Sequence, residues 1–130
     1  VVMADPFERG ERAHLNFGHT FGHAIESVSN FNYAHGEAIA LGMCAASFAA
    51  RELGMIDEPS RQRIVSLIAR AGLPTSGMML DIEQIVAAMY FDKKVRGGKL
   101  RIVLPDRIGN ATIRDDLPRQ LITAAVKSVC

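Results

Sequence analysis

A mainly α-helical domain with one small β-hairpin is the fold that this sequence predicts. Apolar residues recur at helical spacing over most of the 130 residues, and this period stops after Gly97-Gly98. Two short apolar runs follow, 100–104 and 111–113, and the Pro- and Gly-containing segment 105–109 between them favours a hairpin turn. Because the chain has no internal repeat and no long linker, we expect residues 1–130 to form a single domain.

The first two helices are predicted from their apolar faces. From Glu11 to about Ser29 the apolar residues approximate one stripe, and a polar and aromatic break follows. From His35 to Met55 the sequence is alanine-rich and apolar over much of its circumference, which is typical of a central, buried helix that Gly54 stops. Its apolar run, 38–50, is too short to span a bilayer, so we expect no membrane segment.

Three more helices are predicted from caps and stop signals. One opens at Ser60 and ends at Gly72-Leu73-Pro74, the next is capped by Asp81 and runs to Asp92-Lys93-Lys94, and the last covers 117–129. For the first two of these, the expected core positions are Ile64, Leu67, Ile68 and Ala71, then Ile82, Ile85, Val86 and Met89.

Composition limits the classes of function. A hydrophobic content of 48% with 22% charged residues argues against disorder. The net charge of +1 and the dispersed basic residues give no footprint for nucleic acid, so we expect small-molecule partners. Cys44 and Cys130 form neither a disulfide framework nor a CxxC metal motif, and no signal for export precedes them, which fits a cytoplasmic location.

Three of the four histidines lie close together in the sequence. On a helix, His19 and His23 are one turn apart on the same face, and His35, at the start of the next helix, can close a site around a small ligand or a metal. Gly18 and Gly22 would each cost about 1 kcal/mol inside a helix, so their presence predicts a close backbone approach there.

Several interpretations of this cluster are open from the residues alone. The histidines can be ordinary hydrogen-bonded residues, part of a helical metal-binding or interaction module, or part of a metal-dependent hydrolase. The hydrolase is disfavoured because Thr20 stands where the HExxH motif has its glutamate base. Glu26 and Glu37 are available carboxylates, although Glu26 can equally be a surface residue. Arg12 offers a fixed fork for an anion.

Longer motifs carry a resemblance to a known family. In chain order they are Glu8-x-Gly10-x-Arg12, the run 15–26 (LNFGHTFGHAIE), the run 35–43 (HGEAIALGM), the run 70–74 (RAGLP), and Asp92-Lys93-Lys94 followed by 100–109. In these motifs the chain resembles the 3-dehydroquinate synthase family of sugar-phosphate cyclases. The resemblance implies a helical C-terminal domain that lacks the family's N-terminal α/β NAD-binding domain, which also supplies a glutamate metal ligand.

The resemblance also implies a role for each matching residue. It implies His19 and His35 as ligands of a divalent metal, zinc or cobalt, and His23 as an acid/base group that also contacts the substrate phosphate. The other implied roles are a proton acceptor at Glu8 and substrate contacts at Arg12, Leu15, Asn16 and either Lys93 or Lys94. Lys93 is favoured of the two because it continues the stripe of Met89.

The activity implied by the resemblance is the conversion of 3-deoxy-D-arabino-heptulosonate 7-phosphate to 3-dehydroquinate and phosphate, a step of the shikimate pathway. NAD removes and returns a hydride, and an aldol step closes the ring. The full-length enzyme is expected to be a homodimer, and the chain alone to be inactive without the NAD domain. A sibling cyclase, 2-deoxy-scyllo-inosose synthase, is the alternative, and the Arg12-x-x-x-Asn16 block favours dehydroquinate over it.

Overall fold

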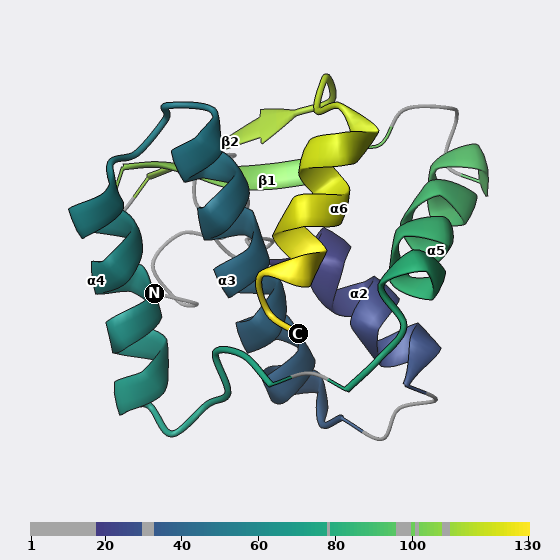
Figure 1. Cartoon of the computed structure of the whole chain (residues 1–130), viewed down its shortest axis with the longest axis horizontal. Coiled ribbons are helices and arrows are strands. Elements are labelled where there is room, and N and C mark those ends of the chain that lie inside the picture. The colour runs from purple at the N-terminus through teal and green to yellow at the C-terminus, as the bar shows by residue number, and fades with distance from the viewer. Residues whose placement is uncertain (1–17, 30–32, 78, 96–99, 101, 108–109) are drawn as a thin grey trace, which may run out of the picture.

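The computed structural model describes residues 18–29, 33–77, 79–95, 100, 102–107 and 110–130, and for 92–95, 107 and 110 it describes the backbone alone. Within this part of the chain the fold is mainly helical with one antiparallel hairpin, as predicted (Figure 1). The elements are α2 (His19–Val28), α3 (His35–Glu52), α4 (Glu58–Arg70), α5 (Ile82–Val95), β1 (Ile102–Arg107), β2 (Asn110–Arg114) and α6 (Arg119–Lys127). The predicted helix start at Glu11 lies outside the described residues.

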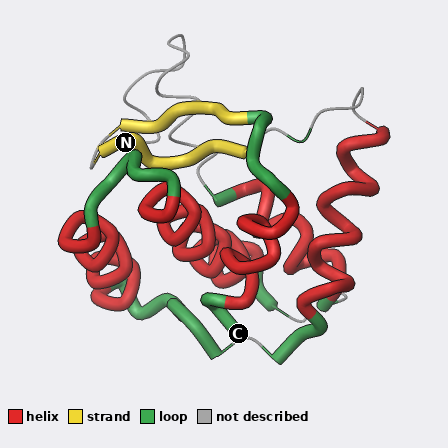
Figure 2. Tube along the Cα trace, turned by 45° about the horizontal axis from the view of Figure 1, so that its top comes forward, coloured by secondary structure: helices red, strands yellow, loops and turns green. Residues whose placement is uncertain are grey.

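Helix α3 is the centre of the fold. It packs against α2, α4, α6 and β1, and α5 packs against α2 and α6. In Figure 1, α4 and α5 therefore lie on opposite sides of the molecule, with the other helices between them. Figure 2 shows the two strands running side by side across one end of the helical layer. The prediction of a central, buried helix is confirmed.

The sequence of α3 explains how several elements can reach it at once. Small side chains cover most of its circumference, and the buried ones are Ala38, Ala40, Gly42, Cys44, Ala45, Ala46, Ser47, Ala49 and Ala50. Neighbouring backbones can approach closely because these side chains add little bulk. The helix begins at His35, as expected, but it ends at Glu52 rather than Met55, because Leu53 forms the cap and Gly54 adopts a left-handed φ of 76°.

Helix α4 corrects two of the sequence predictions. It begins after Asp57 rather than at Ser60, because the Asp57 carboxylate accepts a hydrogen bond from the Ser60 backbone N–H at 2.9 Å. Ile68 is buried as predicted, whereas Leu67 is 53% exposed and Ala71 is also exposed. The helix packs against α3 along one side, so only a narrow stripe of its residues enters the core.

The cap and stripe predicted for α5 are confirmed. Asp81 accepts a hydrogen bond from the Glu83 backbone N–H at 2.8 Å, and Ile85, Val86 and Met89 are buried. No helix in the described part of the chain is long and apolar enough to cross a membrane.

The hairpin is confirmed with longer strands than predicted. Pro105 lies within β1, opposite Ala111, rather than in the turn, and the register shifts between Pro105 and Arg107. Proline has no backbone N–H to donate to a ladder, so in sheets it is found on edge strands and beside irregularities, and both strands of this two-stranded sheet are edges. The turn is therefore shorter than the sequence suggested.

Candidate functional site

The site is built on a direct contact between the backbones of α2 and α3. A Cβ atom at Gly42 would overlap the carbonyl oxygen of Gly18 and would lie 2.7 Å from the backbone nitrogen of Gly22. A Cβ at Gly22 would lie 3.1 Å from the carbonyl oxygen of Ala38. The predicted close approach at the glycines is confirmed, although Gly18 lies outside the helix as its N-cap, with φ at 87°. The sequence reasoning did not single out Gly42.

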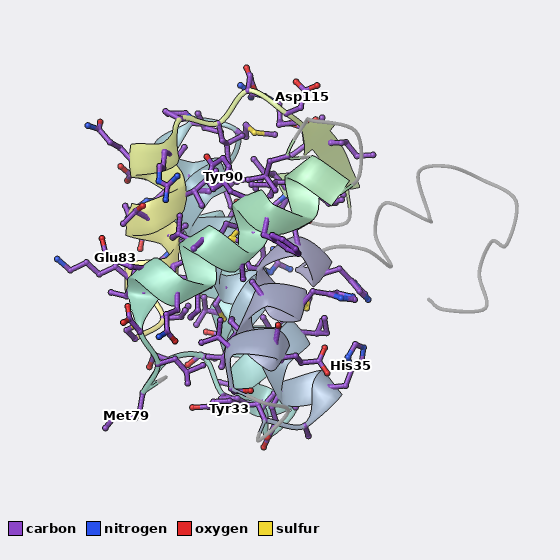
Figure 3. The ribbon with its side chains drawn as sticks, turned by 90° about the vertical axis from the view of Figure 1, so that its right-hand side faces the viewer. Tyr33, His35, Met79, Glu83, Tyr90 and Asp115 are labelled. Atoms are coloured by element: carbon purple, nitrogen blue, oxygen red, sulfur yellow. The ribbon has the colours of Figure 1, made fainter. Side chains whose placement is uncertain are left out.

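This contact brings the three histidines together. The ring centroids of His19 and His23, one turn apart on α2, are 5.5 Å apart. The ring of His35, the first residue of α3, lies 5.9 Å from His19 and 6.4 Å from His23. His19 is half-buried, whereas His23 and His35 are exposed, and His35 projects outward from the ribbon in Figure 3. The cluster predicted from spacing therefore forms, with one open side.

Glu26 binds one of these histidines. Its Oε1 atom lies 2.9 Å from Nδ1 of His35, and the Glu26 side chain is 13% exposed against 61% for that of His35. Glu26 is thus neither a free surface residue nor placed as a third ligand beside the two rings of α2. Glu37, the other carboxylate considered from the sequence, accepts a hydrogen bond from the Ala34 backbone N–H at 3.1 Å and caps α3.

The donor set fits a divalent metal such as zinc but does not complete its coordination. Two imidazoles bound to one tetrahedral zinc ion have ring centroids roughly 5 Å apart. The two separations that involve His19, 5.5 and 5.9 Å, are closer to that value than the 6.4 Å between His23 and His35. Among the described residues, however, no group of three or more His, Cys, Asp or Glu side chains is arranged to hold a metal. His19 and His35 remain the predicted ligands, and a further donor would have to come from outside the described residues.

Most of the predicted substrate contacts cannot be placed. Glu8, Arg12, Leu15 and Asn16 lie outside the described residues. Lys93 and Lys94 lie in the last turn of α5, which packs against α2, but their side chains are outside the description. These roles therefore stay predictions.

The comparison with known families identifies the chain. The family model described as "3-dehydroquinate synthase C-terminal" matches residues 1–95, which include the whole histidine cluster. The chain belongs to this family. The resemblance inferred from the motifs is thus confirmed.

Relatives in the 3-dehydroquinate synthase family are similar over nearly the whole chain. A 3-dehydroquinate synthase of Nostoc punctiforme is 46% identical over 99% of this chain, and one of Wolinella succinogenes is 40% identical over 100% of it. The aligned region makes up 36% and 38% of those two proteins. The chain therefore spans little more than a third of the length of these relatives.

Two solved structures of longer proteins share the fold. The 2-epi-5-epi-valiolone synthase of Streptomyces hygroscopicus, with NAD⁺ and Zn²⁺ bound, superposes with a TM-score of 0.78 at 27% identity, over 88% of this chain and 32% of its own. A 2-deoxy-scyllo-inosose synthase complexed with carbaglucose-6-phosphate, NAD⁺ and Co²⁺ gives the same TM-score at 23% identity, over 95% of this chain and 36% of its own. The fold of this chain thus also occurs as part of these two longer proteins.

Proposed function

We propose that this chain forms the metal- and substrate-binding part of a 3-dehydroquinate synthase, which converts 3-deoxy-D-arabino-heptulosonate 7-phosphate to 3-dehydroquinate and phosphate. The observation that carries the proposal is the gathering of His19, His23 and His35 where α2 meets α3, in a chain of this family. A sibling cyclase for another sugar phosphate is less well supported, because the relatives at 40% and 46% identity are 3-dehydroquinate synthases.

His19 and His35 are the proposed ligands of a divalent metal, zinc or cobalt. Neutral imidazole is a ligand that zinc accepts readily, and a catalytic site usually has three protein ligands and one open position. A bound divalent ion polarises a coordinated hydroxyl group and lowers its pKa, and NAD supplies hydride acceptance and return. We expect the third metal ligand and the NAD site to lie outside residues 1–130, and the solved valiolone synthase supports these two cofactors.

His23 has a different proposed role from its two neighbours. It is the exposed ring of α2, one turn beyond the half-buried His19, so a substrate can reach it from the open side of the cluster. An imidazole can donate or accept a proton near neutral pH and can also hydrogen-bond a phosphate oxygen. We assign His23 the proton transfer at the substrate and a contact to its phosphate group.

Residues outside the described part of the chain complete the proposed substrate site. Arg12, Leu15 and Asn16 precede α2 directly, and a guanidinium group suits the phosphate and carboxylate of the substrate because it donates two parallel hydrogen bonds. Glu8 is the proposed proton acceptor, and Lys93 or Lys94 a further cationic contact. We also propose that the complete enzyme is a cytoplasmic homodimer that binds no nucleic acid.

The test is an activity assay of the protein encoded by the complete reading frame. With 3-deoxy-D-arabino-heptulosonate 7-phosphate, NAD and Zn²⁺ or Co²⁺, we expect stoichiometric release of phosphate and 3-dehydroquinate, and no turnover by residues 1–130 alone. Glucose 6-phosphate serves as the control substrate for a sibling cyclase. Turnover of glucose 6-phosphate in place of the heptulosonate would overturn the substrate, and a reading frame without an NAD-binding region would favour a non-enzymatic metal-binding module.

A further inference from the structure

We propose that Glu26 is a positioning residue for the metal site. Its carboxylate holds Nδ1 of His35 in the protonated form, so that Nε2 carries the lone pair and is the atom with which His35 binds the metal. This inference rests on the proposed function, since the metal is proposed there. It assigns a role to a residue that neither touches substrate nor binds the metal itself.

The chemistry of the pair fixes the tautomer. An ionised carboxylate can only accept hydrogen bonds, so at 2.9 Å from Oε1 of Glu26 the Nδ1 atom of His35 must donate. In a neutral imidazole only one nitrogen carries a proton, which leaves Nε2 as the acceptor and ligand atom. Histidines that bind metals commonly donate their other ring N–H to a carboxylate, which fixes the ring orientation and raises the basicity of the ligand.

The burial of the two side chains makes Glu26 the fixed partner. Its side chain is 13% exposed, whereas that of His35 is 61% exposed and lies at the first residue of α3. An exposed ring at a helix start retains rotational freedom unless a neighbour holds it. Because α2 and α3 are in contact at their glycines, Glu26 of α2 lies beside His35 of α3. The position of the His35 ring is therefore set by α2.

One face of α2 supplies both the ligand and the support. His19, His23 and Glu26 are spaced i, i+4 and i+7, which places them along one stripe of the helix. Each of the three lies beside His35 in space, through the ring contacts of His19 and His23 and the hydrogen bond of Glu26. The start of α3 therefore lies against a polar stripe of α2 formed by these three residues. Of the three, only Glu26 has a side chain that, when ionised, can accept hydrogen bonds but not donate them.

The first experiment observes the tautomer without any metal. Long-range ¹H–¹⁵N NMR spectra of the histidine side chains of residues 1–130, recorded at pH 8 with metal removed, distinguish a protonated Nδ1 from a protonated Nε2. We expect His35 to be protonated at Nδ1 in the native chain. In Glu26→Ala we expect the population to move toward Nε2–H, the tautomer that a neutral histidine side chain prefers in water.

The second experiment measures zinc affinity by calorimetric titration of the native protein and the same variants made in the complete reading frame, where the third ligand is expected to be present. Loss of such a support typically weakens metal binding by about 10–100-fold, and we expect Glu26→Ala to fall in this range. Glu26→Gln keeps an oxygen that accepts from Nδ1, so it should retain the native tautomer and lose less affinity. Glu37→Gln is the matched control: the residue is two positions from His35, and glutamine preserves its cap, so neither readout should change.

The outcomes separate this inference from the proposed function. Zinc binding that persists while Glu26→Ala changes neither the His35 tautomer nor the affinity would overturn the role of Glu26 and leave the proposed function standing. Equal losses in Glu26→Ala and Glu26→Gln, with the tautomer unchanged in both, would also overturn it. Absence of zinc binding in both the native chain and the protein from the complete reading frame would overturn the proposed function and the metal role of His35 with it.

Discussion

Gly42 faces Gly18 so closely that a methyl group at position 42 would overlap the Gly18 carbonyl oxygen. The two glycines belong to the elements that carry the histidines: Gly18 directly precedes His19 on α2, and Gly42 lies on α3 two turns beyond His35. The distance between α2 and α3 therefore also sets the distance between the imidazole rings. Sites that are built on packed helices in this way are more precise than sites on loops.

Substitution of Gly42 is expected to disturb both stability and the site. In Gly42→Ala the added methyl must push α2 away from α3, because the atoms that it meets are backbone atoms. We expect a loss of about 1–3 kcal/mol in the free energy of unfolding, the range typical of overpacked cores, together with weaker zinc binding. Urea denaturation followed by circular dichroism, and calorimetric zinc titration, measure the two effects.

Gly36→Ala is the control for this prediction. Gly36 also lies on α3, but apart from its chain neighbours and the nearby backbone of its own helix, no described atom lies within 4 Å of the position that its Cβ would occupy. Alanine is favoured over glycine in a helix by up to about 1 kcal/mol, so stability should stay the same or rise. Equal stability of Gly42→Ala and the native chain would contradict the backbone contact.

Zinc affinity can distinguish the roles of the three histidines. The distances between their rings are too similar to do so. In the protein from the complete reading frame, which supplies the third ligand, we expect His19→Gln and His35→Gln to weaken zinc binding by more than about 100-fold, beyond the range usual for supporting residues. His23→Gln should change affinity by less than about tenfold. In the protein from the complete reading frame, the same His23 substitution should lower kcat by about 10²–10⁴-fold, as loss of a general acid/base does. A loss of zinc affinity in His23→Gln equal to that in His19→Gln would make His23 a ligand.

Local patterns in the sequence predicted much of this fold because local interactions decide it. The stripe of α5, the cap at Asp81 and the spacing of His19 and His23 all follow from helical geometry. The contacts of Gly42 and Glu26 could not be predicted from helical geometry, because each depends on which residue of a neighbouring helix lies opposite. A carboxylate one turn after His23, in the helix that precedes His35, was the available signal for Glu26. Only the packing of α2 on α3 shows that this carboxylate contacts His35.

Leu67 and Ile68 provide a test of the observed face of α4. Leu67 is 53% exposed and Ile68 is 6% exposed, although the sequence placed both in the core. We expect Ile68→Ala to lower the free energy of unfolding by about 2–5 kcal/mol, as loss of a buried side chain does. Leu67→Ala should cost less than about 0.5 kcal/mol, as surface substitutions do. Losses of similar size in urea denaturation would mean that α4 packs on a different face.

The two cysteines should differ in reactivity. Burial raises the pKa of the Cys44 thiol to about 11, against a smaller opposing effect of the Arg61 charge. Since the thiolate is the reactive form and one pKa unit is a tenfold change, its population at pH 8 should be roughly a hundredfold below that of an ordinary thiol. Cys130 is exposed and should be modified first by iodoacetamide.

Peptide mapping by mass spectrometry over time measures the two modification rates in the folded chain. In a denaturing concentration of guanidinium chloride, both thiols become accessible and should react at similar rates. Modification of Cys44 as fast as that of Cys130 in the folded chain would show that α3 is not buried as described.

The cap of α4 should make stability depend on pH in the acid range. Hydrogen bonds from the Ser60 hydroxyl and backbone N–H hold the pKa of Asp57 below its usual value. A carboxyl group whose pKa is lowered by folding stabilises the fold above its unfolded pKa of about 3.9, and this contribution disappears as the pH falls through the folded value.

Asp57→Asn keeps a capping oxygen but cannot titrate in this range. The native chain should therefore be the more stable of the two at pH 6, and their difference in free energy of unfolding should shrink below about pH 4. Urea denaturation of both proteins at intervals between these values measures the difference, and a difference that stays constant through the acid range would show that the Asp57 carboxylate does not cap α4.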